Sequence, residues 1–445
     1  MTANKVIPGP RELPLIGSIH TLFQDAIEVR TRHSRQFPNI NQLHLGPYTL
    51  VRTNNADYIH DVLVTQVEEF DKTDQVTSIA KPVLGNGLLT STHGPHRRIR
   101  RMVQPAFNHS RIATYADTMV ETALARVGQW QDGQVINLAQ ELVSITMQII
   151  SKVMFSTDIT AESQRLGQAI VTAMAYVTNY FFFPFISYLP VPPTIRYRQA
   201  VARLNDTIYH MIDERRRSGE DRGDLLSMLI QTRDTDDTAL SDEQIRDEVM
   251  TTFIAGHEST ANALSWAFYL LTTNPEVYAR LEAEVNTALE GRKPTVADIA
   301  NLPYTQQVIK ETLRLYPPAH FTIRIALDDT LIGEYPIKKG TLILLDFYTM
   351  HHRADYFPQP ENFDPDRFIT EREREIPKWA YLPFGAGPRV CIGNSFAMME
   401  ATLVLAAMAQ RVRLELAEDK PVRPQPLVSL RPKGGIRMLV HRRAN

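Results

Sequence analysis

The feature that most constrains the fold is a ten-residue segment near the C-terminus. Residues 384–393 read F-G-A-G-P-R-V-C-I-G and hold Cys391, the single cysteine among 445 residues. Gly385 and Gly387 let the backbone adopt positive φ and pass close to a flat ligand. The segment that follows has the apolar spacing of a helix, and a thiol at a helix N-terminus is favoured as the thiolate. The sequence therefore predicts a chemically active cysteine.

The residues alone leave several roles open for this cysteine. Zinc knuckles and iron–sulfur sites need several cysteines, whereas one axial thiolate to a heme iron fits the segment. A lone cysteine is usually a buried structural residue. A cysteine hydrolase that uses one of the 13 histidines as its base is a further alternative.

Composition narrows the class of protein. Hydrophobic residues make up 43% and charged residues 22%, and the net charge is -2, which indicates an ordinary soluble chain without attraction to nucleic acid or anionic membranes. A proline-rich arm covers about residues 1–20. No apolar run reaches the length of about 18 residues that a transmembrane helix needs. We expect a cytoplasmic protein with no transmembrane segment and no nucleic-acid partner.

Hydrophobic periodicity predicts a mainly α protein with a minor β part. Ser241 and Gln244 form a capping box, and the helix that they open is expected to run to Pro275. Strands are expected in residues 40–53 (a hairpin that turns at Gly46-Pro47), 321–327, 341–347 and 428–440 (a hairpin that turns at Gly434-Gly435). Because the strands come from both ends of the chain, we expect one interwoven domain over residues 1–445.

The cysteine segment resembles the F-x-x-G-x-R-x-C-x-G signature of the cytochrome P450 family, which are heme-thiolate monooxygenases, and matches it at every defined position. The resemblance implies the cytochrome P450 fold, with a long central helix over the heme and the cysteine loop beneath it. It also implies heme b as the cofactor, with Cys391 as its axial ligand and Arg389 on a propionate. Phe384, Gly385 and Gly393 would then lie against the heme.

Two further motifs agree with this resemblance. E-T-L-R, with Glu311 and Arg314, matches the family's E-x-x-R, and this spacing puts both side chains on one helix face. F-D-P-D-R-F resembles the family's P-E-R-F, with Asp366 in the place of glutamate. By resemblance, Glu311, Arg314 and Arg367 form a buried triad, which specifies geometry more than it stabilises.

A basic segment, H-R-R-I-R-R, resembles the family helix that crosses a heme edge. His96 and Arg100 lie one helical turn apart and can reach the same carboxylate, although a solvated basic helix would have the same pattern. Arg324 matches a further propionate-binding position. The resemblance thus assigns three arginines and one histidine to two carboxylates.

The segment A-G-H-E-S-T, residues 255–260, lies within the expected long helix. Its Ala255-Gly256 pair allows a small ligand to approach the backbone, so that Ala255 would lie beside the heme. The family pattern places the proton-relay alcohol directly after the acid. Here Ser259 follows Glu258 and lacks the threonine methyl that fixes the rotamer, while Thr260 comes next. We expect protons to pass through Glu258 and through either Ser259 or Thr260.

By resemblance, the protein hydroxylates an apolar small molecule with O2. No flavin-binding segment is found, so we expect no fused reductase and a separate ferredoxin or flavodoxin as the electron donor. Arg97, Arg98 and Arg101 are candidates for its docking face.

The substrate is expected to be a retinoid similar to retinoic acid, or a related terpenoid acid, because G-H-E-S-T resembles the retinoid and sterol branch of the family. A fatty acid is the second expectation. The expected pocket residues are Phe182, in an aromatic stretch over residues 176–188, and Phe253, Phe321 and Thr322. A heme-thiolate isomerase or dehydratase and a non-catalytic heme-binding protein are the alternatives.

Overall fold

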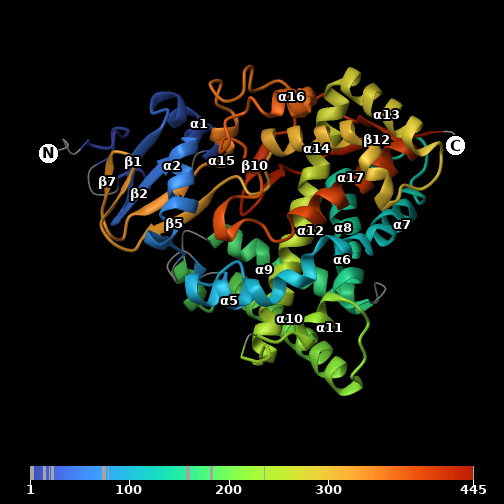
Figure 1. Ribbon diagram of the computed structural model, residues 1–445, viewed down its shortest axis with the longest axis horizontal. Helices are drawn as coiled ribbons and strands as arrows, with labels where there is room; N and C mark the ends of the chain where they lie inside the picture. Colours follow the sequence, from blue (N-terminus) through green and yellow to red (C-terminus); the bar gives the residue numbers. More distant parts are fainter. Residues whose placement is uncertain are drawn as a thin grey trace.

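A 32-residue helix, α12 (Asp242–Thr273), runs through the helical part of the computed structural model (Figure 1). The structure describes residues 5–13, 17–19, 21, 25–72, 77–78, 80–156, 161–180, 184–234 and 236–443. The predicted capping box is present, because Gln244 N donates to Ser241 Oγ and Ser241 N donates to Gln244 Oε1. The helix ends before Pro275, as expected.

Shorter helices surround α12 and make the protein mainly α, as predicted. Their bounds are α1 (Ala26–Gln36), α2 (Ala56–His60), α4 (Lys81–Leu84), α5 (His93–Val103), α6 (His109–Ala113), α7 (Ala116–Val127), α8 (Leu138–Phe155), α9 (Ala161–Tyr180), α10 (Pro192–Ser218), α11 (Leu225–Gln231), α13 (Pro275–Leu289), α14 (Pro303–Leu315), α15 (Phe347–His351), α16 (Thr370–Glu373) and α17 (Asn394–Arg411). Short 3-10 or π turns lie at Asp61–Thr65, Val67–Glu69, Gln104–Phe107, Pro184–Tyr188, Val296–Asn301, Pro365–Phe368 and Gly387–Arg389. No described helix has both the length and the hydropathy that crossing a bilayer requires.

The main sheet joins strands near the N-terminus to strands from residues 322–345. The predicted hairpin is formed by β1 (Ile40–Leu45) and β2 (Tyr48–Thr53), which pair antiparallel. Next to β2 lies β8 (Leu342–Leu345), in parallel, followed by β5 (Thr322–Ala326) and β3 (Phe70–Asp71). This sheet occupies the left of Figure 1, apart from most of the helices.

The prediction of a hairpin over residues 428–440 is wrong. β11 (Leu430–Pro432) pairs with β10 (Pro424–Pro426), while β12 (Arg437–Arg442) pairs with β9 (Val412–Leu416) and β4 (Val135–Asn137). The Gly434-Gly435 turn directs the chain toward β4 instead, where a Cβ on Gly435 would lie 2.4 Å from Asn137 Oδ1. A separate two-stranded sheet consists of β6 (Thr330–Ile332) and β7 (Tyr335–Ile337).

Candidate functional site

Cys391 lies between the Gly387–Arg389 turn and α17, as the cysteine segment predicted. Its backbone N donates to Phe384 O over 2.9 Å, which closes the loop, and its thiol accepts the N–H of Gly393. Solvent reaches the side chain, yet the surrounding protein atoms are close enough that burial raises the pKa of the thiol. The Gly393 N–H and Arg100 lower this pKa by less.

The two glycines of the loop differ in what surrounds them. Both have positive φ, +72° at Gly385 and +68° at Gly387. A Cβ on Gly387 would lie 2.0 Å from the carbonyl oxygen of Leu63, whereas a Cβ on Gly385 would meet nothing within 4 Å. Gly387 is thus required by a close approach of two backbones, and Gly385 leaves one side of the loop open.

Two of the predicted propionate ligands lie close to one another. Arg389 donates to Asp71 Oδ1 (2.8 Å) and to Ser91 O (2.9 Å), and its buried Nε has no partner among the described residues. Arg324 is buried and donates to Thr322 Oγ1 over 3.0 Å. Burial, and next the charge of Arg389, lower the pKa of Arg324 to about 10.

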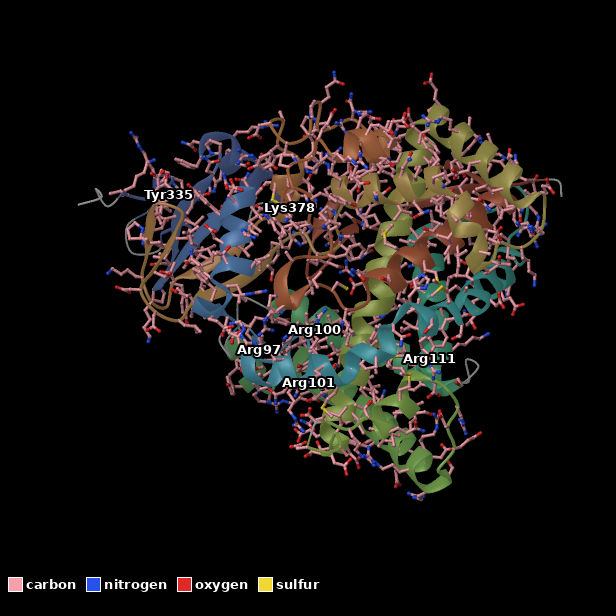
Figure 2. All side chains as sticks on the ribbon, viewed as in Figure 1. Arg97, Arg100, Arg101, Arg111, Tyr335 and Lys378 are labelled. Carbon is pink, nitrogen blue, oxygen red and sulfur yellow. The ribbon has the colours of Figure 1, made fainter. Side chains whose placement is uncertain are left out.

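The two predicted residues of α5 face the same region. His96 is buried, and burial followed by the charges of Arg389 and Arg100 lowers the pKa of its imidazole to about 3, so the ring is neutral. Arg100 donates to the backbone oxygen of Val390 over 2.7 Å, which ties α5 to the residue before Cys391. Figure 2 shows Arg97, Arg100 and Arg101 along α5.

Lys72 belongs to the same group, although the sequence analysis missed it. Its Nζ donates to Leu89 O over 2.7 Å. Burial and the charges of Arg324 and Arg389 hold the pKa of its amine well below the ordinary value. No sequence spacing connects residue 72 to these arginines. The ladder between β3 and β5, which pairs Asp71 with Ile325, brings them together.

The charges of this group fit a ligand with carboxylates. Its basic members are Lys72, His96, Arg100, Arg324 and Arg389. Among the described residues, the carboxylate paired with this group is that of Asp71. Buried cations are normally paired, so mutual repulsion and the unpartnered Arg389 Nε indicate a place for further negative charge. Two propionates next to Cys391 would supply that charge.

The middle of α12 carries an open face. Ala255 is exposed although most of this helix is buried, and Ser259 Oγ donates to the Ala255 carbonyl oxygen over 2.7 Å. Such i to i−4 hydrogen bonds from serine bend helices. From α8, Thr146 Oγ1 donates to the His257 carbonyl oxygen over 2.8 Å, so a second side chain competes for the helix backbone here.

The three predicted relay residues point to different partners. Glu258 accepts a hydrogen bond from Ser429. Thr260 is buried, and its hydroxyl donates to Glu400 of α17. Ser259 alone combines a hydroxyl with the open face at Ala255. The hydroxyls of Ser259 and Thr260 therefore lie in different environments, a difference that the sequence alone does not reveal.

The predicted triad residues form a buried ion cluster. Arg314 donates to both oxygens of Glu311 (2.7 and 2.8 Å), and Arg367 Nε lies 3.2 Å from Glu311 Oε1. Arg314 also donates to the backbone oxygens of His351 and Asn362, so the cluster connects α14 to the segment that leads to the cysteine loop.

The predicted substrate residues do not share one environment. Phe253 is buried against Phe155 of α8, with ring centroids 6.3 Å apart, and Phe321 packs under the guanidinium of Arg30. The hydroxyl of Thr322 accepts from Arg324, as described above. Phe182 lies outside the described residues. Their role in substrate binding stays a prediction.

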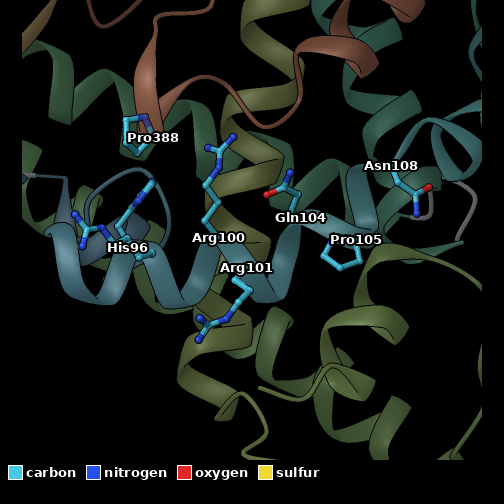
Figure 3. A pocket seen from close by; sticks show the side chains of 8 residues that line it. His96, Arg100, Arg101, Gln104, Pro105, Asn108 and Pro388 are labelled. Atoms are coloured by element: carbon cyan, nitrogen blue, oxygen red, sulfur yellow. The ribbon is translucent and has the colours of Figure 1, made fainter. Parts of the chain in front are cut away.

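A surface pocket of about 490 Å³ lies between α5 and the cysteine loop (Figure 3). Arg100 points toward the part of the cysteine loop that carries Pro388, while Arg101 points away from it. The lining residues are His96, Arg97, Arg100, Arg101, Gln104, Pro105, Asn108 and Pro388. This pocket gives the otherwise nearly neutral molecule a locally basic surface.

Comparison with known proteins points to one family. The family model for cytochrome P450 matches residues 7–439. Cyclooctatin synthase of Streptomyces melanosporofaciens is 40% identical over 405 residues, which cover 89% of this chain and 87% of that protein. Pentalenene oxygenase of Streptomyces avermitilis is 33% identical over 95% of this chain and 94% of that protein. The crystal structure of the cytochrome P450DA heme domain superposes with a TM-score of 0.91 at 30% identity, over 99% of this chain and 98% of that one.

Proposed function

Because the chain belongs to the cytochrome P450 family, we propose that it inserts one oxygen atom of O2 into a C–H bond of a terpenoid. Membership makes it a monooxygenase that binds heme through a cysteine thiolate, and Cys391 is the only cysteine. The observation that carries the proposal is the placement of this thiol beside the basic group. The bound heme supplies the activation of O2.

The basic group would hold the two propionates. Arg389 and Arg324, on the cysteine loop and on β5, are tied to different elements, so they fix the orientation of the carboxylates. His96 is neutral and can donate one hydrogen bond without adding charge. Arg100 reaches the backbone next to Cys391 and lowers the pKa of its thiol, which favours the thiolate.

Protons would pass through Glu258 and Ser259. Ser259 is the hydroxyl that directly follows the acid and that lies at the open face of α12, bonded to Ala255 O. The hydroxyl of Thr260 donates to Glu400 where α12 packs against α17, so it would stabilise this helix contact rather than carry protons.

The names of the relatives favour a terpenoid substrate. Cyclooctatin synthase and pentalenene oxygenase are both named for terpenoids. Within this class the retinoid-like acid expected from the sequence is one candidate and a hydrocarbon or alcohol is another. A fatty acid is the candidate outside it, since a leukotriene-B4 omega-hydroxylase of Mus musculus is 32% identical.

Monooxygenases of this family need electrons from a redox protein, and a ferredoxin or a flavodoxin would supply them here. The pocket beneath the cysteine loop would be the docking face, because Arg97 and Arg101 are exposed on its rim. A donor with an acidic surface would be attracted to this basic rim. A cytoplasmic location stays a prediction from the sequence.

The test combines a spectrum with a substrate panel. The reduced protein under carbon monoxide should give the strongly red-shifted Soret band of thiolate ligation, and Cys391→Ser should lose it. The ferric protein is then titrated with pentalenene, cyclooctat-9-en-7-ol, retinoic acid and palmitic acid, and product is measured with a surrogate ferredoxin and reductase. Hydroxylation of a terpenoid is expected. Turnover of palmitic acid alone would overturn the substrate class.

A further inference from the structure

The carboxylate of Glu258 is held by a residue from the far end of the chain. Ser429 Oγ donates to Glu258 Oε1 over 2.5 Å and accepts from Asn262 Nδ2 over 3.0 Å. Glu258 and Asn262 lie one turn apart on α12 and thus share a face. Because an amide N–H can only donate, the single hydroxyl hydrogen of Ser429 is left for the carboxylate.

Ser429 is fixed in place on both sides. It lies in the turn between β10 and β11. Trp266 Nε1 of α12 donates to Leu430 O over 3.1 Å, and Leu430 N donates to Pro318 O over 3.0 Å. On the other side, His320 Nε2 bonds Leu427 O over 2.9 Å. Packing of this kind holds a hydroxyl at a fixed point, as a positioned contact to a working group requires.

The arrangement leaves one carboxylate oxygen for other work. Glu258 is half-buried, and in the part of the chain that the structure describes its Oε2 accepts no hydrogen bond. A carboxylate that is bonded through one oxygen keeps a restricted set of rotamers. The bond to Ser429 therefore decides in which direction Oε2 points.

We propose that Ser429, oriented by Asn262, is a positioning residue that holds Glu258 in the pose from which it delivers protons toward Ser259. This inference rests on the proposed role of Glu258 and Ser259 in oxygen activation. Ser429 does not itself touch the reacting atoms. It acts through the acid, so its removal should divert electrons from product to hydrogen peroxide and leave heme binding intact.

The experiment measures how much product forms for each NADPH oxidised. Substrates are the terpenoids pentalenene, cyclooctat-9-en-7-ol and retinoic acid, with the surrogate ferredoxin, and hydrogen peroxide is measured in parallel. Ser429→Ala should lower the product yield several-fold and raise peroxide, while heme content, the carbon monoxide spectrum and the substrate-induced spin shift stay unchanged. Ser429→Thr keeps the hydroxyl and should restore the yield. Asn262→Ala should give an intermediate loss, because the hydroxyl hydrogen is then free to rotate.

The double variant separates positioning from structure. If Ser429 acts through Glu258, then Ser429→Ala in a Glu258→Gln background should cause no further loss, whereas independent effects would add. A normal yield in Ser429→Ala, with Glu258→Gln impaired, would overturn the inference and leave the proposed function standing. A normal yield in Glu258→Gln itself would instead overturn the proposed relay.

Discussion

At the scale of single residues, the site separates two adjacent hydroxyls. Ser259→Ala removes the hydroxyl bonded to Ala255 O, so we expect the product yield per NADPH to fall several-fold with peroxide rising in proportion. Thr260→Val should leave this yield near the wild-type value. It should instead lower the free energy of unfolding by about 1–3 kcal/mol, because a buried oxygen of Glu400 loses its donor. Uncoupling in Thr260→Val but not in Ser259→Ala would reverse the assignment.

Glu400 itself makes a prediction about pH. Burial raises the pKa of its carboxyl from 4.5 to about 8, and its Oε2 has no partner among the described residues. Between these two pH values the folded protein keeps a proton that the unfolded chain has released. The free energy of unfolding must therefore fall as pH rises through this window, by up to about 1.4 kcal/mol per pH unit for this group.

Glu400→Gln removes this dependence. The free energy of unfolding is measured with urea on the holoenzyme at a series of pH values from 5 to 8. As pH rises, this free energy should increase in the glutamine variant relative to the wild type. Glu248, whose carboxyl pKa burial also raises to about 8, is present in both proteins and cancels in the difference. A difference that is constant across the series would mean that Glu400 is ionised throughout.

At the scale of elements, a short sequence motif predicts a helix start or a tight turn where the residues of that motif alone determine it. The capping box of Ser241 placed the start of α12, and Gly46, with φ +61°, placed the β1–β2 turn. The prediction of a hairpin at Gly434-Gly435 is wrong because the two glycines specify only that the chain turns. The partner of β12 is decided by β9 and β4, which lie far away in the sequence.

A glycine of the cysteine loop and a glycine of a distant turn give a matched pair of variants at this scale. Gly387→Ala combines positive φ with a Cβ 2.0 Å from Leu63 O, so the loop must shift against the Asp61–Thr65 turn. Gly133→Ala, in the turn before β4, has a similar φ of +74° and open space, so it should cost only about 1 kcal/mol of backbone strain. We expect Gly387→Ala to lose most of its heme and its red-shifted carbon monoxide band. Gly133→Ala should keep both, as measured by absorbance per protein.

Equal heme content in the two variants would contradict this account of the loop. It would mean that the Asp61–Thr65 turn yields to the new methyl group at little cost. The far-UV circular dichroism of both variants serves as the control for global unfolding, because only the loop is expected to respond.

At the scale of the whole molecule, the site is assembled from segments that no local pattern connects. Lys72, His96, Arg324 and Arg389 come from four stretches of chain, and the β3–β5 ladder and α5 bring them together. Three of these were predicted only because motifs matched a family. Lys72, like Ser429 and Glu400, has no motif, and its part in the site follows from tertiary contacts alone.

The basic rim of α5 carries the last prediction. Arg97 and Arg101 have side chains 59% exposed and pair with Glu68 and Asp234. Reversing both charges should slow reduction by an acidic ferredoxin or flavodoxin by about 10-fold at low salt, because steering acts mainly on the association rate.

Salt separates docking from damage to the fold. Since added ions screen exposed charges, the wild-type rate should fall with ionic strength until it approaches that of the Arg97→Glu/Arg101→Glu variant. Lys433→Glu reverses an exposed charge in the turn before β12, an element that lies away from α5 in Figure 1, and should change the rate little. Stopped-flow reduction traces give these rates, and dithionite reduction, which needs no protein docking, should be equal in all three proteins. If the double reversal left the ferredoxin-supported rate unaltered at every salt concentration, the docking face would have to lie away from α5.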